Sequence, residues 1–252
     1  MNRYLLVWLS ISVLLVTGIP LYAGEADTDT VVVTMIEGTV HVYAPGSARG
    51  APVEKSARIS RDSEIRVAEK SRVELKFPDG SVMRLAEKSQ LKLSEVKFDK
   101  KSGAKQVGVK LSVGRLWAKI KKLATADSKV EVKTVNAVAG VRGTVYRVNV
   151  ESDSSAMVRV YDGSVYVAGV PREVPKPAAQ VSGPVPVPGP HEVPPPYHEV
   201  TMEQWLEIVK SFQQITISAQ GVASKPQDFN VKEDAADEWV RWNQERDGQL
   251  TF

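Results

Sequence analysis

The side chains that usually carry out enzyme chemistry are scarce in this chain of 252 residues. It has no cysteine, and its three histidines are His41, His191 and His198. A Ser-His-Asp triad needs its histidine in a rigid, pocketed position. His41 instead lies in a predicted strand, and the other two lie in a proline-rich segment. The sequence also lacks a nucleophile elbow, a phosphate loop and a dinucleotide glycine pattern. It therefore predicts a protein that is not an enzyme.

Metal and cofactor sites are equally poorly supported. His191 and His198 are each followed by glutamate, but seven residues of extended chain separate them, so we interpret them as surface residues. The absence of cysteine excludes disulfides, thiolate zinc sites and a lipidated cysteine anchor. The paired carboxylates Asp234 and Asp237 are more simply a helix N-terminus. We expect no metal and no cofactor.

Lysines offer a different chemistry, the binding of anions. Lys119, Lys121 and Lys122, together with Lys100, Lys101 and Lys105, could bind phosphate or carboxylate groups. Residues 49–122 hold 20 Lys and Arg against 9 Asp and Glu, whereas residues 192–252 hold 5 against 11. No aromatic ladder accompanies the lysines, so we expect no nucleic acid, while an anionic envelope polymer would fit. Alternatively, the lysines line the wet faces of an antiparallel sheet.

Residues 31–170 predict an all-β domain. Apolar and polar residues alternate in short segments, which marks strands with one buried and one wet face. Asp79-Gly80 and Asp162-Gly163 each separate two such segments, a strong hairpin signal. Short, regular spacing between strands favours an antiparallel β-sandwich or roll. Examples of the alternating pairs are Val73/Leu75, Leu91/Leu93, Val107/Val109, Val130/Val132, Val158/Val160 and Val165/Val167.

One segment of the domain places two glycines and a lone arginine in an otherwise apolar run, from Ala137 to Tyr146. Glycines so placed indicate positive φ or the close approach of another chain segment. Arg142 is either buried in an ion pair with Glu131 or Glu151, or presented to a ligand. We expect the buried pair, because the flanking glycines suit tight packing.

This segment resembles the signature of the FecR family, periplasmic sensor domains named for ferric-dicitrate regulation. Gly140, Arg142, Gly143 and Thr144 match the motif, whereas Val135 stands where the family usually has proline. The resemblance spans about residues 31–170. It implies a binding module, because family members of the transmembrane type sense an outer-membrane event and relay it to a cytoplasmic sigma factor.

Residues 1–23 have the order of a secretory signal peptide. A basic residue precedes an apolar run from Tyr4 to Val16, and small residues follow up to Ala23. Cleavage near this point predicts a periplasmic or secreted protein. The alternative is an uncleaved N-terminal anchor, because the segment from Tyr4 to Ala23 is about as long as the ~20 residues that span a bilayer.

Residues 171–200 are rich in proline, with ten of the fifteen prolines between 171 and 196. Proline fixes φ and removes a hydrogen-bond donor, so this segment should be extended and form no ladder of its own. It is either a stiff spacer or a strap laid along the β domain, and we slightly favour the strap.

Residues 201–252 predict a tail of short helices. Trp205, Ile208, Val209, Phe212 and Ile215 follow helical spacing, and a second helix starts at Asp234. We expect Trp205, Phe212, Trp239 and Trp242 to dock this tail on the β domain. Hydrophobic contact should dominate, because burying a large aromatic contributes roughly 1.5–3 kcal/mol. An exposed ion pair contributes only about 0–1 kcal/mol. An undocked tail would be an arm that awaits a partner.

These features favour an exported, non-enzymatic interaction module of the cell envelope with a protein partner. One alternative is a binder of an anionic envelope polymer, such as lipopolysaccharide or an acidic glycan, through a basic sheet face. Another is a signalling subunit that acts through a membrane partner. Because only Met1 to Arg3 precede the apolar run, we expect no direct contact with a sigma factor.

Overall fold

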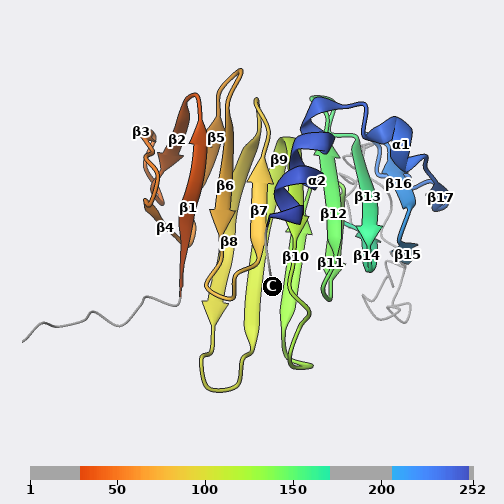
Figure 1. The fold of residues 1–252 in the computed structure, drawn as a ribbon, viewed down its shortest axis with the longest axis horizontal. Helices are drawn as coiled ribbons and strands as arrows, with labels where there is room; N and C mark the ends of the chain where they lie inside the picture. The colour runs from red at the N-terminus through yellow and green to blue at the C-terminus, as the bar shows by residue number, and fades with distance from the viewer. Residues whose placement is uncertain (1–28, 171–205, 250–252) are drawn as a thin grey trace, which may run out of the picture.

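The computed structural model describes residues 29–170 and 206–249, which form a β sandwich with two short helices (Figure 1). Predictions for the leader, the proline-rich segment and Trp205 lie outside these residues. No helix within the described ranges is long and apolar enough to cross a membrane.

The two layers of the sandwich follow from the strand pairing. The layer beneath the helices, called the covered layer, contains in spatial order β4 (Arg58–Ser60), β1 (Thr30–Glu37), β6 (Arg72–Lys76), β7 (Val82–Leu85), the second part of β9 (Lys105–Lys119), β12 (Val145–Val150), β13 (Ala156–Asp162), β16 (Gln213–Ile217) and β17 (Gln227–Asp228). The other layer, called the open layer, contains β3 (Ala51–Pro52), β2 (Val40–Tyr43), β5 (Glu64–Val67), β8 (Gln90–Phe98), the first part of β9, β10 (Lys129–Lys133), β11 (Ala137–Val141), β14 (Ser164–Gly169) and β15 (Leu206–Lys210).

Strand β9 belongs to both layers. Its residues up to Val113 pair with β8 and β10, and its residues from Gly114 onward pair with β7 and β12. Among the described strands, all pairs are antiparallel except β9–β10. The predicted all-β sandwich is therefore confirmed, with one parallel pair.

The core lies between the layers and follows the predicted alternation. Val130 and Val132 of β10 are buried, as are Val158 and Val160 of β13. The residues between them point outward and are more exposed. Period-two patterning thus identified the inward face of most strands, because each layer buries one face against the other.

One of the two predicted hairpins is correct. Asp79 and Gly80 lie in the loop that joins β6 to β7, which pair with each other. Asp162 and Gly163 instead join β13 of the covered layer to β14 of the open layer, and these strands do not pair. The same turn residues serve a crossing between layers, because each strand finds its partners elsewhere in its own layer.

The helix predicted around Ile208 and Phe212 is wrong. Residues 206–210 and 213–217 are the strands β15 and β16, joined by a turn in which Phe212 has a positive φ of 66°. β15 pairs with β14, and β16 pairs with β13. Pairing with existing strands outweighs local helical spacing, which β-branched residues support only weakly.

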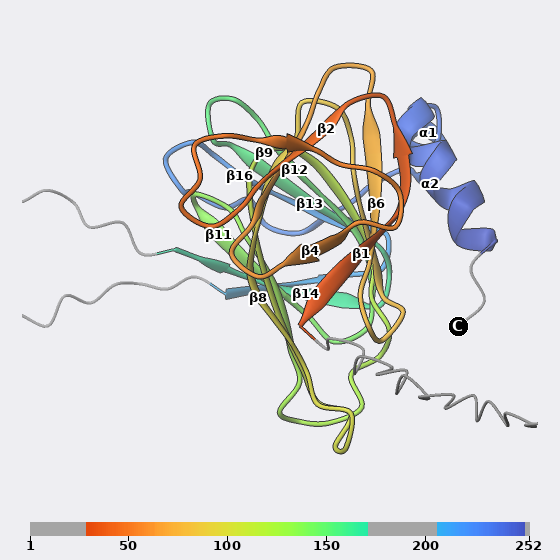
Figure 2. The same cartoon turned by 90° about the vertical axis from the view of Figure 1, so that its left-hand side faces the viewer.

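The predicted second helix is present, but it begins at Glu238 and not at Asp234, which is the last residue of a separate short helix. α1 (Val231–Asp234) and α2 (Glu238–Gly248) lie on the outer side of the covered layer (Figure 2). Asp237 caps α2, because its side chain accepts a hydrogen bond from the backbone N–H of Trp239. The sandwich therefore has one outer face beneath helices and one outer face without them among the described residues.

Gly143 sits where the chain passes from β11 in the open layer to β12 in the covered layer. Its φ is +110°, and a Cβ there would lie 2.6 Å from Cα of Lys122. Neither the dihedral angle nor the space suits a side chain. Gly140, three residues earlier in β11, has no such constraint, because a Cβ would find only the carbonyl oxygen of Tyr166, at 3.9 Å.

These two glycines form a matched pair for mutation. We expect Gly143→Ala to lower the free energy of unfolding by about 2–3 kcal/mol, because it forces a non-glycine residue into positive φ against backbone. Gly140→Ala should change it by no more than about 0.5 kcal/mol. Urea denaturation of both variants measures this difference, and equal losses would contradict the account.

Candidate functional site

The outer face of the covered layer carries a row of arginines. Strand register places Arg84, Trp117, Arg147 and Arg159 opposite one another on β7, β9, β12 and β13. Arg115 lies on β9 two residues before Trp117. Alternation alone makes these positions outward-facing, yet Arg84 and Arg147 are almost fully buried. We call Arg84, Arg115, Arg147 and Arg159 the arginine face.

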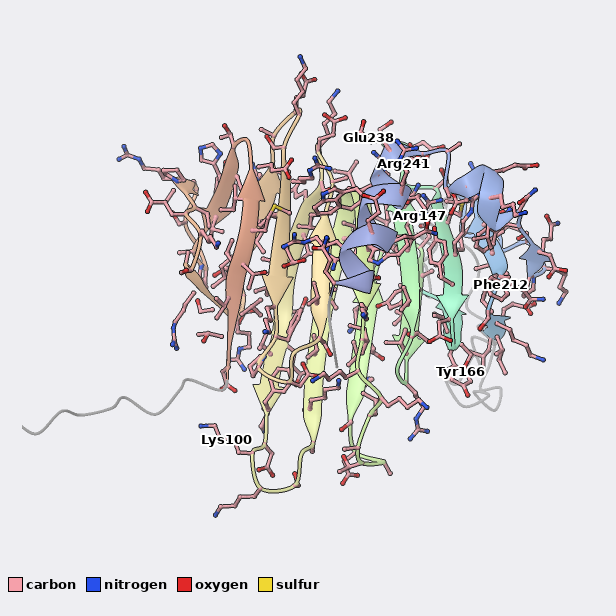
Figure 3. The ribbon with its side chains drawn as sticks, viewed as in Figure 1. Lys100, Arg147, Tyr166, Phe212, Glu238 and Arg241 are labelled. Atoms are coloured by element: carbon pink, nitrogen blue, oxygen red, sulfur yellow. The ribbon has the colours of Figure 1, made fainter. Side chains whose placement is uncertain are left out.

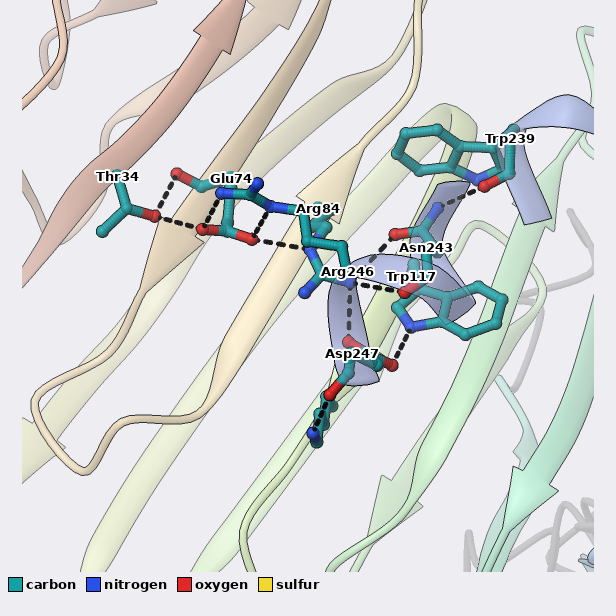
Figure 4. A network of polar contacts seen from close by, with 9 residues as sticks. Thr34, Glu74, Arg84, Trp117, Trp239, Asn243, Arg246 and Asp247 are labelled. Atoms are coloured by element: carbon teal, nitrogen blue, oxygen red, sulfur yellow. Dashed lines mark hydrogen bonds and ion pairs between the residues drawn. The ribbon is translucent and has the colours of Figure 1, made fainter. Parts of the chain in front are cut away.

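A first set of ion pairs joins this face to α2 through Arg84 (Figure 4). Nε of Arg84 lies 2.7 Å from a carboxylate oxygen of Glu74 on β6, and Nη1 lies 2.7 Å from Asp247 on α2. Arg246 of α2 contacts Glu74 at 2.6 Å. The indole N–H of Trp117 donates to Asp247 at 2.9 Å. Charged groups from the sheet and the helix thus alternate in space.

A second set of contacts centres on Asp234, the last residue of α1. Its carboxylate accepts hydrogen bonds from Arg147 at 2.8 Å, from Arg159, and from the hydroxyl of Tyr161 at 2.5 Å. Asp237 pairs with Arg115 at 2.9 Å. The interpretation of this carboxylate as part of a helix N-terminus is therefore wrong, because Asp234 ends α1 and is a buried acceptor for three donors of the sheet.

Aromatic rings fill the space between these ion pairs. Trp239 and Trp242 of α2 stack on each other with ring centroids 5.3 Å apart, and Trp117 stacks on Tyr161 at 4.5 Å. The guanidinium of Arg72 lies 4.5 Å from the centre of a Trp242 ring, in a cation–π contact. The helix is thus held by a small aromatic cluster, and a network of ion pairs and hydrogen bonds accompanies the expected hydrophobic contact.

The network changes the ionisation of its buried groups. Burial raises the pKa of Glu74, but hydrogen bonds from Arg246, Thr34 and Arg84 outweigh it and lower that pKa to about 2. Burial is also the main cause that raises the pKa of Tyr161, and its hydrogen bond to Asp234 adds to this. Glu74 therefore stays ionised at all but strongly acidic pH.

The structure separates the motif residues that the sequence grouped. Arg142 is exposed, and it makes no ion pair within the described residues, so the expected buried pair is wrong. Its proposed partner Glu131 pairs with Lys129 and Lys133 instead. Arg142 points outward because it sits at the corner between the layers. Thr144, in contrast, is buried at the start of the covered layer.

The predicted lysine site is also divided. Nζ of Lys119 donates to the backbone carbonyl of Asp247 at 2.9 Å, so this lysine helps to hold α2. Lys121 is half-buried and Lys122 is exposed. Lys105 is buried and paired with Asp79. Lys100 lies at the tip of the projecting β8–β9 hairpin (Figure 3).

The predicted docking aromatics have different environments. Trp239 is buried and Trp242 partly buried at the contact with the covered layer, whereas Phe212 is 54% exposed in its turn. Sequence reasoning missed the arginine face, because a pairing such as Arg84 with Asp247 joins residues 163 positions apart. The opposite charge balances of residues 49–122 and 192–252 were the available signal.

The outer face of the open layer has an apolar patch. Tyr166 lies opposite Gly140 on one side and Ile208 on the other, and Ala168 lies opposite Leu206. Tyr166, Leu206 and Ile208 are 40%, 62% and 47% exposed. We call these five residues of β11, β14 and β15 the apolar patch. In the described part of the chain no helix covers this patch, because both helices lie on the other outer face (Figure 2).

The described residues also contain no cluster of three or more side chains that could hold a metal ion.

The folded-state pKa of Glu74 predicts a dependence of stability on pH. Because that pKa of about 2 lies below the ordinary value of 4.5, the ionised carboxylate stabilises the fold above pH 4.5. This contribution is lost as the pH falls toward 2. Glu74→Gln should therefore cost about 3 kcal/mol at neutral pH, since it breaks a buried network. The cost should shrink in acid.

Thermal unfolding of both proteins from neutral to acidic pH measures this difference. Glu69→Gln is the control, because Glu69 is exposed and pairs only with exposed Lys88 among the described residues. A cost for Glu74→Gln that does not change with pH would contradict the assignment.

A comparison with protein families agrees with the sequence motif. Residues 63–166 match the family model described as FecR protein. Two crystal structures of a candidate anti-sigma factor from Parabacteroides distasonis align with 69% of this chain at 15% identity and a TM-score of 0.45. This chain covers 63% and 62% of their lengths. No curated protein sequence matches the chain.

The expectation of no direct sigma-factor contact gains no support from these comparisons. Since the motif residues Gly140 to Thr144 fall inside the matched range, residues 63–166 of this chain are a FecR domain.

Proposed function

We propose that the protein is a non-enzymatic interaction module of the cell envelope, which holds a partner protein through the apolar patch. The observation that carries this proposal is the patch itself. Tyr166, Leu206 and Ile208 form a continuous exposed apolar surface on neighbouring strands. Clustered apolar side chains of this kind mark interaction sites more often than single exposed ones.

Gly140 adds a second argument. A glycine in a strand weakens it, and one that the fold does not require often marks a place where another backbone approaches. Gly140 has ordinary backbone angles, and a Cβ would fit there with no contact closer than 3.9 Å. Its bare backbone beside Tyr166 leaves room for an occupant. The fold itself does not need a glycine at position 140, so we assign this motif glycine a role in binding.

The edge of the open layer supports the same conclusion. The described edge strands β3, β4 and β17 are only two or three residues long, which limits pairing with another chain. β15 has five residues without proline, and within the described chain it pairs only with β14. An extended segment of a partner could add to this edge while its apolar side chains cover Ile208 and Leu206.

The two alternatives rest on fewer observations. A binder of anionic envelope polymers would use exposed Lys100, Lys101 and Lys122, but Lys105 and Lys119 are engaged within the protein. Binding of a polymer would weaken strongly with salt. A signalling subunit that acts through a membrane partner is compatible with the interaction module. Coexpression with a receptor or regulator would favour that role.

Substitution in the apolar patch tests the proposed function. We expect Tyr166→Glu to reduce co-purification of the envelope partner at least about tenfold, because a charge would be desolvated at the interface. The melting temperature should change little, since Tyr166 is on the outer face. Val222→Glu is the control, because Val222 is 68% exposed outside the patch. Equal capture by both variants would overturn the proposal.

Export is tested separately. We expect the mature protein to begin near Gly24 or Asp27 and to be recovered from the periplasm or the medium, because residues 1–23 have the pattern of a signal peptide. N-terminal sequencing of the purified protein measures this. Intact Met1 in a membrane fraction would support the uncleaved anchor instead.

A further inference from the structure

The arginine face is a binding site that is already occupied, and its occupant belongs to the same chain. Five cations of the covered layer face α1 and α2: Arg84, Arg115, Arg147, Arg159 and Lys119. The helices and the residue between them provide the carboxylates of Asp234, Asp237 and Asp247, which form ion pairs with these cations. From the geometry we propose that this face binds an acidic, tryptophan-bearing helix of a partner protein, and that residues 230–249 are an internal substitute that the partner displaces.

The internal occupant leaves donors of the face unused. Within the described residues, Nη2 of Arg84 and Nε of Arg147 are buried without a hydrogen-bond partner. Arg84 is fully buried, and Arg147 is 3% exposed. A buried N–H of a charged group without an acceptor is costly. A helix with one or two more carboxylates at this face would satisfy both arginines, so the present fit is good but incomplete.

Displacement of the helices would not open the core of the sandwich. Trp239 and Val240 of α2 pack with Ala86 and Trp117 in a small cluster, which is separate from the core between the layers. The remaining groups of the face are mostly charged, and water solvates them well once they are uncovered. Buried ion pairs add little net stability, because desolvation offsets most of their attraction. The helices can therefore leave while the strands stay folded.

The internal helices define the chemistry of the partner. Asp234 pairs with Arg147 and Arg159, Asp237 pairs with Arg115, and Asp247 pairs with Arg84. Stacked tryptophans at positions 239 and 242 place rings beside the arginines. The partner segment should thus be a short helix with aspartates at both ends and tryptophan between them. This site is independent of the apolar patch, on the opposite outer face.

A peptide of residues 230–249 with a fluorescent label serves as the probe. It is titrated into the full-length protein and into the full-length Asp247→Asn variant, and binding is followed by fluorescence anisotropy. The variant loses the ion pair with Arg84, and its single amide oxygen can accept from only one of Arg84 and Trp117, so its own helix competes less well. We expect the variant to bind the peptide at least about tenfold tighter than the unmodified protein, as loss of a buried charge contact implies.

Two controls isolate the charge contacts. Glu245→Gln changes an exposed acid of α2 and should bind the peptide like the unmodified protein. A peptide with asparagine at positions 234, 237 and 247 should not bind. Absence of binding to Asp247→Asn, or equal binding to Glu245→Gln and Asp247→Asn, would overturn the proposal.

Hydrogen exchange on the unmodified full-length protein gives a readout that does not depend on a variant. Amides of α2 should exchange well before those of β9 and β12 if the helices open alone. Exchange of α2 only together with these strands would overturn the proposal. Dimers of Asp247→Asn that form with rising concentration and block the peptide would assign the site to a second copy, and would overturn the assignment to a partner protein.

Discussion

The whole sandwich depends on one strand that serves both layers. β9 runs for fifteen residues, giving its first part to the open layer and its second part to the covered layer. The change occurs at Gly114, where φ is +100° and a Cβ would lie 2.4 Å from Cα of Ser89. Because β8 and β10 flank one part, and β7 and β12 flank the other, this bend fixes the position of both layers. The arginine face and the core inherit their geometry from it.

Each layer buries one face in the core, so the outward side chains of its strands must contact either solvent or another element. The two layers of this protein differ in what their outward side chains contact. On the covered layer the outward residues are mainly charged, and α1 and α2 supply carboxylates that match them. On the open layer near β15 the outward residues are apolar and remain exposed among the described residues. Ion pairs can be broken with little net cost when water replaces them, but an exposed apolar patch gains by any contact. The two faces therefore differ in how they would meet partners.

Much of the fold was predictable from local sequence, and most of the candidate site was not. Alternation identified the buried positions of β10, β12 and β13, because burial on one face imposes a period of two. The spacing of Ile208, Val209 and Phe212 misled, because a helix and a strand pair can both contain it and only the neighbours β13 and β14 decide. Arg142 misled for the opposite reason. A lone arginine in an apolar run is buried only if another segment of the chain packs over it. The residues around Arg142 do not indicate whether such a segment is present.

The family motif takes its meaning from the corner that it turns. Gly140 belongs to the open layer and borders the apolar patch, Gly143 makes the crossing, and Thr144 begins the covered layer. Tyr146 lies two residues further on and is fully buried, while Arg147 beside it points to the arginine face. Eight consecutive residues, from 140 to 147, thus reach the patch, the core and the arginine face. The corner at Gly143 therefore connects the strand that borders the apolar patch directly to the strand that carries Arg147.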